Sequence, residues 1–352
     1  EQFADALRID HYVRHVSSVA STDGQHVQLY VRERVLAATL ARTGDLEGRV
    51  VLFVHGAGTP AEVAFDLPYE DYSWMGYLAA AGYDVFSVDM EGYGRSSRPH
   101  PMNDYCNLSQ ENQRALKLDG ATCESSATGP ATTIQSDWDD IAQALEYIRE
   151  LRDVERISLF GWSLGGPRAG GYAAQFPEQV DKLVLLAPAY RRDLPGARPR
   201  GDDGAVMTYQ TWESLNTLWN AQVGCENQYD PLAAQSIWSE MLASDPVGAT
   251  WGPGMRRAPR TLVWGWNEAA VAQSTTPTLM VAAVHDVQVD AARVRDLYED
   301  LGAQNKVLLD LGCASHNAMW ERVHLELFSA SLEWLEDGTV DGVSSGIVRR
   351  GY

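Results

Sequence analysis

The sequence predicts an α/β protein whose core is a largely parallel β-sheet covered by helices on both faces. Short apolar runs alternate with amphipathic segments along most of the chain, which is typical of such a sheet. Several runs, among them residues 50–54, are continuously apolar, as strands buried on both faces are. Residues 160–166, Phe-Gly-Trp-Ser-Leu-Gly-Gly, place a serine between glycines where a strand meets a helix. A length of 352 residues fits one large domain with an insertion.

The chain is expected to form eight strands in the sheet. Residues 11–20 and 27–35 are strand-like and are separated by a turn, and apolar residues alternate with mostly polar ones in the second run. The other strands are expected at residues 50–54, 83–88, 156–160, 182–187, 278–284 and 307–311. Helices are expected at residues 74–81, 136–151, 169–175, 290–301 and 318–335. The Gly-rich residues after 337 are expected to lie on the surface.

Two stretches interrupt the alternation of strands and helices. Residues 97–133 are polar and rich in turn-forming residues, which indicates a long loop. Residues 190–275, called the insertion from here on, lose the pattern altogether. Within the insertion, residues 207–223 and 231–242 look helical and carry several aromatic side chains.

The composition excludes some classes of partner. The net charge of −20 argues against binding to nucleic acid or to an anionic membrane surface. No apolar stretch approaches the about 20 residues that span a bilayer. No cluster of Cys and His has the spacing of zinc ligands, and no phosphate-binding loop is present, since Gly92-Tyr93-Gly94 lacks the later glycine and the Lys-Ser/Thr. We therefore expect neither a metal nor a cofactor.

The residues Gly161-Trp162-Ser163-Leu164-Gly165 carry the clearest chemical signal. In a turn this tight the serine takes a strained backbone conformation, and side chains at its neighbours would collide, which explains the two flanking glycines. The turn would raise the Ser163 hydroxyl above the end of the sheet. On the pentapeptide alone, a plain Gly-rich turn between strand and helix remains an equal alternative.

With its predicted strands and helices and the serine turn in this sequence order, the chain resembles the α/β-hydrolase superfamily. The resemblance covers roughly residues 26–189 and 276–336 and rests on several motifs in the family's sequence order. These motifs are His55-Gly56-Ala57-Gly58, Gly92-Tyr93-Gly94-Arg95-Ser96, the serine turn, Thr276-Pro277-Thr278-Leu279 leading to Asp286, and His316. The sequence departs from the family at Ala283 and Ser315, where glycines are common.

The resemblance implies a catalytic triad of Ser163, Asp286 and His316. A serine hydroxyl needs a base to take its proton during attack, and histidine is the residue that titrates near neutral pH. Of the eight histidines, His316 alone lies in a loop between the last strand and the last helix. Asp286 follows a buried strand and would orient the imidazole. Asp290 is kept as the alternative acid, although the start of the next helix suits it better.

Further expectations follow from the same resemblance. The oxyanion hole would use the backbone N–H of Leu164 and that of Ala57, with Gly58 as the alternative to Ala57. The mostly parallel, eight-stranded core would comprise residues 1–189 and 276–352. The insertion after the sixth strand would form a helical, Trp-rich cap over the active site.

The aromatic residues suggest how a substrate would be held. The tryptophans expected to contact it are Trp162, Trp212, Trp219, Trp238, Trp264 and Trp266, although most rings of the insertion would also serve its own core. The insertion also carries the arginines Arg191, Arg192, Arg256, Arg257 and Arg260. They could hold an anionic substrate group, but solvation at the surface is the favoured interpretation.

The function expected from sequence is hydrolysis of a carboxylic ester or lactone of a hydrophobic small molecule, aromatic or of medium chain length, through an acyl-enzyme. The same triad also serves C–C bond hydrolases that act on diketones and cofactor-free perhydrolases, so these stay open. A non-catalytic ligand receptor is the third alternative. The partner is a small molecule in each case, and the oligomeric state is left open.

Cys106 and Cys123 lie in the same long loop, where a cross-link would restrict the unfolded chain. We hypothesise a disulfide between them and, with it, a secreted or periplasmic location. The alternative is a pair of free thiols in a cytoplasmic enzyme, so the compartment stays open.

Overall fold

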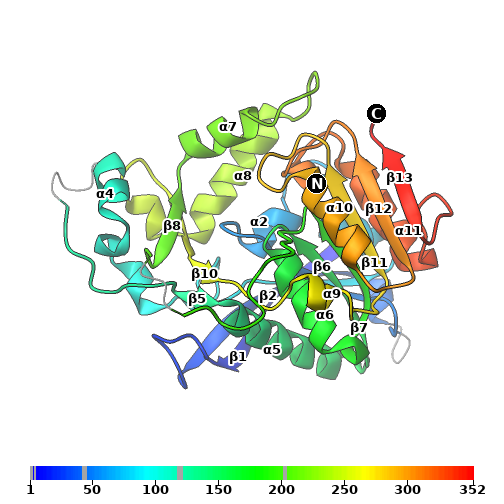
Figure 1. Cartoon of the computed structure of the whole chain (residues 1–352), viewed down its shortest axis with the longest axis horizontal. Coiled ribbons are helices and arrows are strands. Elements are labelled where there is room, and N and C mark those ends of the chain that lie inside the picture. Colours follow the sequence, from blue (N-terminus) through cyan, green and yellow to red (C-terminus); the bar gives the residue numbers. More distant parts are fainter. Residues whose placement is uncertain (1–2, 4, 42–45, 117–121, 201–203) are drawn as a thin grey trace.

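The computed structural model describes residues 3, 5–41, 46–116, 122–200 and 204–352 (Figure 1). Within this part of the chain, a nine-stranded sheet has the order β1-β2-β4-β3-β6-β7-β11-β12-β13. Its strands are β1 (Ala6–Val16), β2 (His26–Leu36), β3 (Val50–Val54), β4 (Asp84–Val88), β6 (Ile157–Trp162), β7 (Val180–Leu186), β11 (Thr278–Ala283), β12 (Lys306–Leu311) and β13 (Gly346–Arg350). Strand β2 pairs antiparallel with β1 and β4, and the other neighbouring strands are parallel.

Eight of these strands lie where the sequence predicts them, and the mostly parallel sheet is confirmed. Strand β13 was not expected, because the Gly-rich tail was assigned to the surface. It adds to the edge of the sheet by pairing in parallel with β12. Its side chains alternate, with Val348 buried and Ile347 exposed, but a five-residue strand among glycines gives too short a pattern to recognise.

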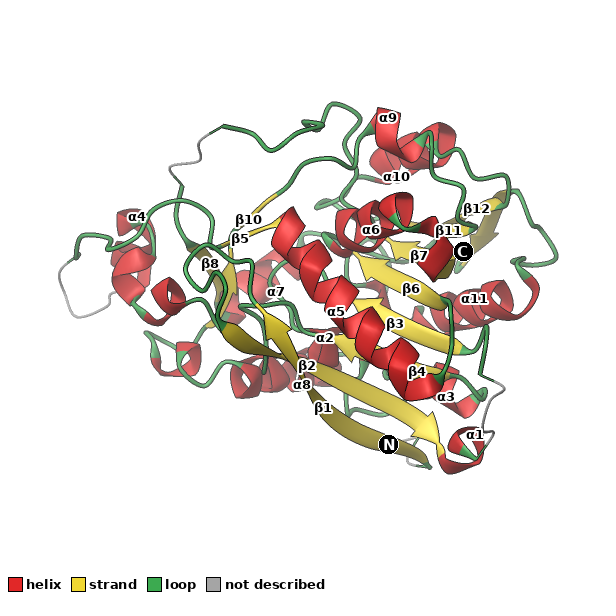
Figure 2. Ribbon diagram, turned by 90° about the horizontal axis from the view of Figure 1, so that it is seen from below, coloured by secondary structure: helices red, strands yellow, loops and turns green. Residues whose placement is uncertain are grey.

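Helices cover both faces of the sheet. On one face, α5 (Ile134–Arg152) and α6 (Gly171–Gln175) lie across the strands, with α9 (Glu268–Val271) and α10 (Ala291–Asp300) beside them (Figure 2). On the other face, α2 (Ala61–Phe65), α3 (Trp74–Ala80) and α11 (His324–Asp337) pack together with the sheet. Apart from two helices of the insertion, the other helical segments of the described residues are α1 (Ala37–Leu40), α4 (Gln110–Leu116), the π-turn η3 (Gly166–Gly170), and the 3₁₀ turns η1 (His100–Asn103), η2 (Tyr105–Asn107), η4 (Pro177–Gln179), η5 (Gly248–Thr250) and η6 (Ala318–Trp320).

The insertion follows β7, the sixth strand of the sheet, and mixes helices with strands. Its elements are β8 (Met207–Gln210), α7 (Trp212–Asn220), α8 (Pro231–Ser244), β9 (Arg256–Pro259) and β10 (Thr261–Leu262), followed by α9. Strands β8 and β9 pair antiparallel, and β10 pairs with β5 (Thr132–Thr133) of the long loop. The expectation of a helix from residue 207 is therefore wrong at residues 207–210, because β9 supplies a partner strand that the local sequence does not reveal. The division into core and cap stays a prediction.

All four cysteines of the chain are paired. Cys106 and Cys123 form the disulfide that the sequence suggested, with their sulfur atoms 2.04 Å apart. Cys225 pairs with Cys313, which was not foreseen, because 88 residues separate them. The second disulfide joins the insertion to the loop that follows β12.

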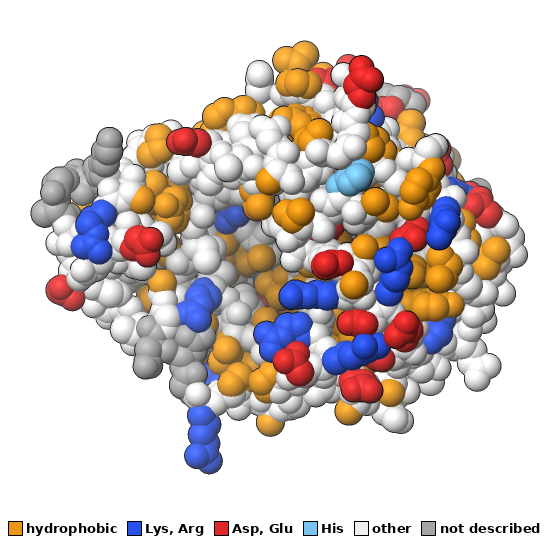
Figure 3. Space-filling model, turned by 45° about the horizontal axis from the view of Figure 1, so that its top comes forward, with side chains coloured by type: hydrophobic (Ala, Val, Ile, Leu, Met, Phe, Trp, Pro, Cys, Tyr) orange, Lys and Arg blue, Asp and Glu red, His pale blue; other side chains and the backbone are white. Residues whose placement is uncertain are grey.

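The surface carries a mixture of charges despite the acidic composition. Figure 3 shows Lys and Arg side chains gathered on one face, where a hollow has hydrophobic side chains at its floor. Of the helices in the described residues, none combines the length and the apolar character needed to cross a membrane.

Candidate active site

Ser163 lies at the top of the sheet, between the end of β6 and the turn η3. Its φ angle is +56°, a left-handed conformation that costs a non-glycine residue energy and is found where the surrounding structure enforces it. Its N–H donates to the carbonyl of Leu186 at 3.0 Å, and its carbonyl accepts from Gly166 and Ala189 at 2.9 and 2.8 Å. These three bonds hold the strained turn in place.

The structure explains why glycines flank the serine. A Cβ atom added at Gly161 would lie 2.4 Å from the carbonyl oxygen of Gly165, and one added at Gly165 would lie 2.4 Å from that of Val54. The first is a backbone atom of the buried turn and the second a backbone atom of β3, so neither can move away. The strand, the turn and β3 can approach this closely only with glycine at both positions.

His316 and Asp286 form a buried pair. The Nδ1 atom of His316 is 2.7 Å from Oδ2 of Asp286. The other carboxylate oxygen accepts from the backbone N–H groups of Gln288 and Val289 at 2.7 and 2.8 Å, which fixes the carboxylate. This arrangement leaves Nε2 as the imidazole atom that can receive a proton. His316 and Ser163 line the same cavity of about 90 Å³, called the Ser163 cavity below.

Asp290, the alternative acid, takes a different part in the structure. It is the N-cap of α10, and its side chain accepts from the backbone N–H of Ala292 at 2.8 Å. This bond satisfies an N–H at the helix start that has no partner within the helix. Of the two candidate aspartates, the structure therefore brings Asp286 and not Asp290 to His316.

The loop from His55 to Gly58 borders the Ser163 cavity. His55 donates from Nδ1 to the carbonyl of Gly56 at 2.8 Å and accepts at Nε2 from the N–H of Met90 at 3.1 Å, so it holds the backbone of two loops in place. Burial, with the charge of Arg168, keeps the pKa of His55 well below its usual range. Ala57 lines the cavity, and Gly58 has a φ of +88°. The oxyanion roles of Ala57, Gly58 and Leu164 stay a prediction.

A short network explains the departure from glycine at Ser315. The buried carboxylate of Glu321 accepts from the backbone N–H and the hydroxyl of Ser315 at 2.7 and 2.6 Å. It also accepts from the Nε1 of Trp219 and from Gln228, both at 2.9 Å. Because Trp219 and Gln228 belong to the insertion, Glu321 links the insertion to the loop that carries His316.

Two of the six tryptophans expected at the substrate line the Ser163 cavity. These are Trp162 and Trp219, and Trp320, which the sequence did not single out, joins them. The ring of Trp320 lies 5.4 Å from that of Trp162 and 6.0 Å from that of Trp219. In the sequence, the feature that could have indicated a place for Trp320 at the cavity is its position four residues after His316, the candidate base.

The other four tryptophans do not line this cavity. Trp212 is 36% exposed at the start of α7, and its ring meets that of Trp238. Trp212 and Trp219 share a face of α7, but they are seven residues apart. The helix rises about 10 Å over seven residues, so Trp212 lies beyond the cavity that Trp219 lines. Trp264 and Trp266 border a separate cavity beside Trp138.

Arg256 is the charged residue that the structure brings to the site. It lies at the start of β9, lines the Ser163 cavity, and donates from Nη2 to the side chain of Gln210 at 3.0 Å. Its Nε and Nη1 atoms are buried without a hydrogen-bond partner in the described residues. Burial lowers the pKa of Arg256 to about 10, so the side chain stays a cation at neutral pH. It lies beside Gly58, where an added Cβ would be 2.2 Å from Nη2.

The other arginines of the insertion differ from Arg256. Arg191 and Arg192 are exposed and pair with surface carboxylates, as solvation at the surface predicted. Arg257 is buried in an ion pair with Asp245, at 2.6 Å. The expectation of surface solvation is thus wrong for Arg257, which is buried against Asp245, and for Arg256, because the pairing of β8 with β9 turns the Arg256 side chain inward toward Gln210.

Comparison with known proteins identifies the family. A family model described as the alpha/beta hydrolase fold matches residues 49–323. The chain therefore belongs to the α/β-hydrolase fold family, as its resemblance predicted. A solved serine hydrolase involved in carbazole degradation has a TM-score of 0.56 and 17% sequence identity, covering 94% of this chain and 99% of its own. At that identity the likeness shows the shared fold.

Curated relatives match parts of the chain. A probable 1-acylglycerol-3-phosphate O-acyltransferase of Oryza sativa subsp. japonica is 26% identical over 178 residues, which are 50% of this chain and 32% of the relative. A 2-hydroxy-6-oxo-6-phenylhexa-2,4-dienoate hydrolase of Comamonas testosteroni is 25% identical over 142 residues, 40% of this chain and 37% of the relative. The chain thus spans about a third of the length of these relatives.

Proposed function

We propose that this hydrolase cleaves a carboxylic ester or lactone by means of Ser163, His316 and Asp286. The supporting observation is the buried hydrogen bond between His316 and Asp286, 2.7 Å long, beside a strained serine that lines the same cavity. A buried carboxylate that orients an imidazole toward a serine hydroxyl is the arrangement that acyl transfer requires.

In the proposed reaction, Ser163 Oγ bonds to the substrate carbonyl carbon while His316 Nε2 takes the hydroxyl proton. The oxyanion that forms would be held by the N–H groups of Leu164 and Ala57, or of Gly58 in place of Ala57. The bond to the leaving oxygen then breaks, and His316 returns the proton to it. Water attacks the acyl-enzyme by the same route, which releases the acid and restores Ser163.

We infer that the substrate also carries an anionic group, which Arg256 binds. A guanidinium with two buried nitrogen atoms that lack hydrogen-bond partners is costly unless a ligand completes its hydrogen bonds, and a carboxylate matches its planar fork. Apolar side chains of Leu215, Leu218 and Met241 line another part of the cavity. The acid would thus have an apolar portion and a carboxylate, and the cavity of about 90 Å³ favours a short acyl group over a long one.

Labelling with a fluorophosphonate, followed by a substrate panel, tests the enzyme assignment. We expect stoichiometric labelling of Ser163, and loss of both labelling and ester hydrolysis by several powers of ten in Ser163→Ala. A folded native protein that is not labelled and cleaves none of the p-nitrophenyl esters, lactones or diketones would favour the non-catalytic receptor instead.

A pair of matched esters tests the role of Arg256. We expect Arg256→Met to lower kcat/KM about 10–100-fold for a p-nitrophenyl hemi-ester of a short dicarboxylic acid, and to change it little for the neutral ester of equal length. Arg192→Met, at an exposed site, is the control. If both esters lose activity equally, Arg256 supports the site structurally or the oxyanion, and the inference of an acidic substrate is wrong.

A second candidate is hydrolysis of a C–C bond in a diketone. Arg256 favours this candidate as well, because the named substrate of the Comamonas relative is a dienoate, which is a carboxylate. The substrate panel separates the two candidates: a C–C bond hydrolase would turn over the acidic diketone at least about tenfold faster than any ester. Cofactor-free perhydrolysis has no separate observation in its favour.

We further propose that the protein works outside the reducing cytoplasm. Both cysteine pairs form disulfides, and such bonds persist mainly in oxidising compartments. Intact mass after alkylation, with and without reductant, is the measurement. Four free thiols before reduction, in protein taken from its native source, would contradict the proposal.

A further inference from the structure

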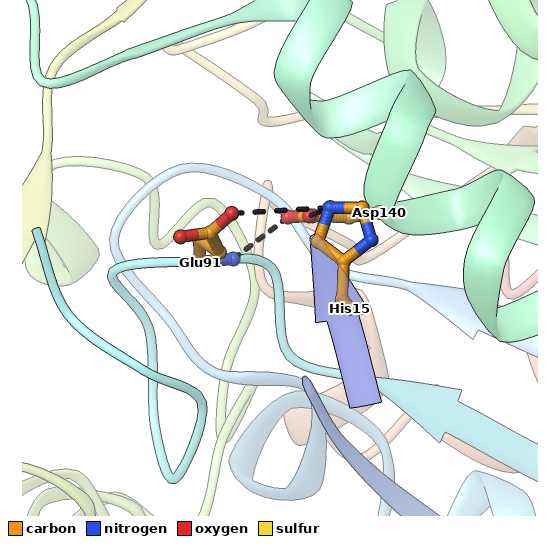
Figure 4. A group of neighbouring side chains, drawn as sticks. All are labelled: His15, Glu91 and Asp140. Atoms are coloured by element: carbon orange, nitrogen blue, oxygen red, sulfur yellow. Dashed lines mark hydrogen bonds and ion pairs between the residues drawn. The ribbon is translucent and has the colours of Figure 1, made fainter. Parts of the chain in front are cut away.

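Three buried side chains from distant segments meet away from the Ser163 cavity. His15 is near the end of β1, Glu91 lies in the loop after β4, and Asp140 lies in α5 (Figure 4). Their exposed fractions are 6%, 1% and 1%. One ligand atom from each of the three lies within 4.8 Å of those of the other two. None of the three lines the Ser163 cavity.

Each carboxylate has one oxygen bound by the protein and one directed at the histidine. The hydroxyl of Ser17 donates to Oε2 of Glu91 at 3.0 Å, and the backbone N–H of Glu91 donates to Oδ2 of Asp140 at 2.8 Å. The remaining oxygens, Oε1 and Oδ1, have no hydrogen bond within the described residues, and neither does the ring of His15. The Nε2 atom of His15 lies 3.3 Å from Oδ1 and 4.0 Å from Oε1.

The charges of this cluster are not balanced by the protein. Among the described residues, no lysine or arginine forms an ion pair with Glu91 or Asp140. Two buried carboxylates beside an imidazole without a hydrogen-bond partner therefore have no cation from the described side chains, and a bound metal ion would supply one.

We propose that His15, Glu91 and Asp140 bind a divalent transition-metal ion, for which zinc is the best fit. Zinc binds imidazole nitrogen and carboxylate oxygen at about 2.0–2.2 Å in a tetrahedron, so its ligand atoms lie roughly 3.3–3.5 Å apart. The 3.3 Å separation already matches this spacing, and the 4.0 Å separation needs a small contraction. Calcium takes six to eight oxygens, and magnesium keeps several waters, which suits a buried three-ligand site poorly.

The oxygen atoms that face away from the proposed metal support the same interpretation. Metal-binding carboxylates are held by hydrogen bonds from a second layer of residues, and Ser17 and the Glu91 backbone supply such bonds here. The ion would tie the edge strand β1 to the loop after β4 and to α5. Its role would therefore be structural, and it does not depend on the proposed hydrolase activity.

Sequence spacing could not reveal this site, and the expectation of no metal rested on that spacing. Local motifs for zinc place two ligands within a few residues. Here each ligand comes from a separate element, and the ligands meet because β1, the loop after β4 and α5 pack together.

Zinc titration of the full chain tests the proposal. After chelator treatment and confirmation of the apo state by elemental analysis, we expect one Zn²⁺ to bind per chain by calorimetry. At a hundredfold excess over Kd, we expect the Tm to rise by about 4 °C. Ca²⁺ and Mg²⁺ at the same concentration should not raise it. The substitution Asp140→Asn should weaken zinc binding at least about tenfold.

A matched control separates metal binding from misfolding. Glu150→Gln, an exposed residue near the end of α5, should leave zinc binding unchanged. Apo Asp140→Asn should melt no lower than the apo native chain, because the substitution removes a buried, unpaired carboxylate. Absence of zinc binding to the native chain, or equal binding to native and Asp140→Asn, would overturn the proposal. In that case the three groups share a proton instead.

Discussion

At the scale of single residues, two aspartates four positions apart have opposite surroundings. Asp286 is buried against His316, whereas Asp290 caps a helix at the surface. Both follow the same strand, so the type of residue does not distinguish them. The distinction comes from the backbone N–H groups of Gln288 and Val289, which turn the Asp286 carboxylate toward the imidazole.

This difference predicts different effects of the same substitution. Asp286→Asn should lower kcat by several powers of ten, because the amide cannot stabilise the imidazolium and presents the wrong hydrogen-bonding partner to Nδ1. Asp290→Asn should leave kcat within about twofold, since asparagine also caps helices well. Steady-state kinetics on one activated ester are sufficient. Inactivation by Asp290→Asn with a harmless Asp286→Asn would reverse the assignment of the acid.

At the scale of elements, the insertion contacts the loops that carry Asp286 and His316, the candidate acid and base. Gln222, just after α7, accepts from the backbone N–H of Val287 and of His316 at 3.2 and 3.4 Å. Three residues later, Cys225 is bound to Cys313, which lies three residues before His316. The second disulfide therefore fixes the part of the insertion that supports the site.

The two disulfides should consequently differ in their effect on activity. We expect the double variant Cys225→Ser/Cys313→Ser to lose about 2–4 kcal/mol of unfolding free energy and about tenfold in kcat/KM, because the support of the His316 loop is loosened. The control Cys106→Ser/Cys123→Ser should lose stability but keep its kcat/KM. Urea unfolding and ester kinetics measure the two effects, and equal loss of activity in both variants would contradict a specific role for Cys225–Cys313.

At the scale of the whole molecule, buried ionisable groups make folding depend on pH in two directions. Burial, with the charge of Arg168, keeps the pKa of His55 well below its usual range. Burial, with the charge of Glu62, raises the pKa of Asp89 to about 7. As pH falls below about 6.5, the unfolded chain protonates His55 and the folded chain does not, so the free energy of unfolding falls. For Asp89 the free energy of unfolding falls as pH rises from about 4 to 7.

The contribution of His55 to this pH dependence can be isolated by comparing how steeply the free energy of unfolding changes with pH in the native chain and in a variant without His55. Below pH 6, the free energy of unfolding of the native chain should decrease more steeply with falling pH than that of His55→Gln, by about 1.4 kcal/mol per pH unit. Protonation of His55 is disfavoured in the folded chain because the ring is fully buried and lies beside the charge of Arg168. Urea unfolding at pH 7, 6, 5.5 and 5 gives the slopes, with the exposed His26→Gln as control. Parallel slopes for native and His55→Gln would contradict a neutral, buried His55.

Much of the sheet and of the candidate site could be predicted from the sequence, because the signals are local. Continuous apolar runs mark strands buried on both faces, and eight of the nine strands in the described sheet carry such runs or an alternating pattern. The glycines around Ser163 are required by contacts within a few residues of the turn and with the adjacent strand. Asp286 and His316 each follow a strand, and parallel strands bring their carboxyl ends to the same edge.

Only the tertiary structure decided which other side chains reach the cavity. The sequence does not distinguish Arg256 from four other arginines of the insertion. The pairing of β8 with β9 places Arg256 at the Ser163 cavity. Trp320 and Gln210 face the cavity, and Trp212 and Trp264 do not, although no local pattern separates them. The reason is that short segments without periodicity do not specify which way a side chain points, and the packing of neighbouring elements does.

The same reason applies to the contacts between distant segments. Cys225–Cys313 and the group of His15, Glu91 and Asp140 join parts of the chain that are far apart in sequence. The entropic cost of closing a loop rises only slowly with its length, so sequence distance neither forbids nor indicates such a contact. The sequence by itself determined the family, the tight turn at Ser163 and the order of the candidate residues Ser163, Asp286 and His316. The surroundings of those residues were decided when the insertion, β1 and α5 packed onto the sheet.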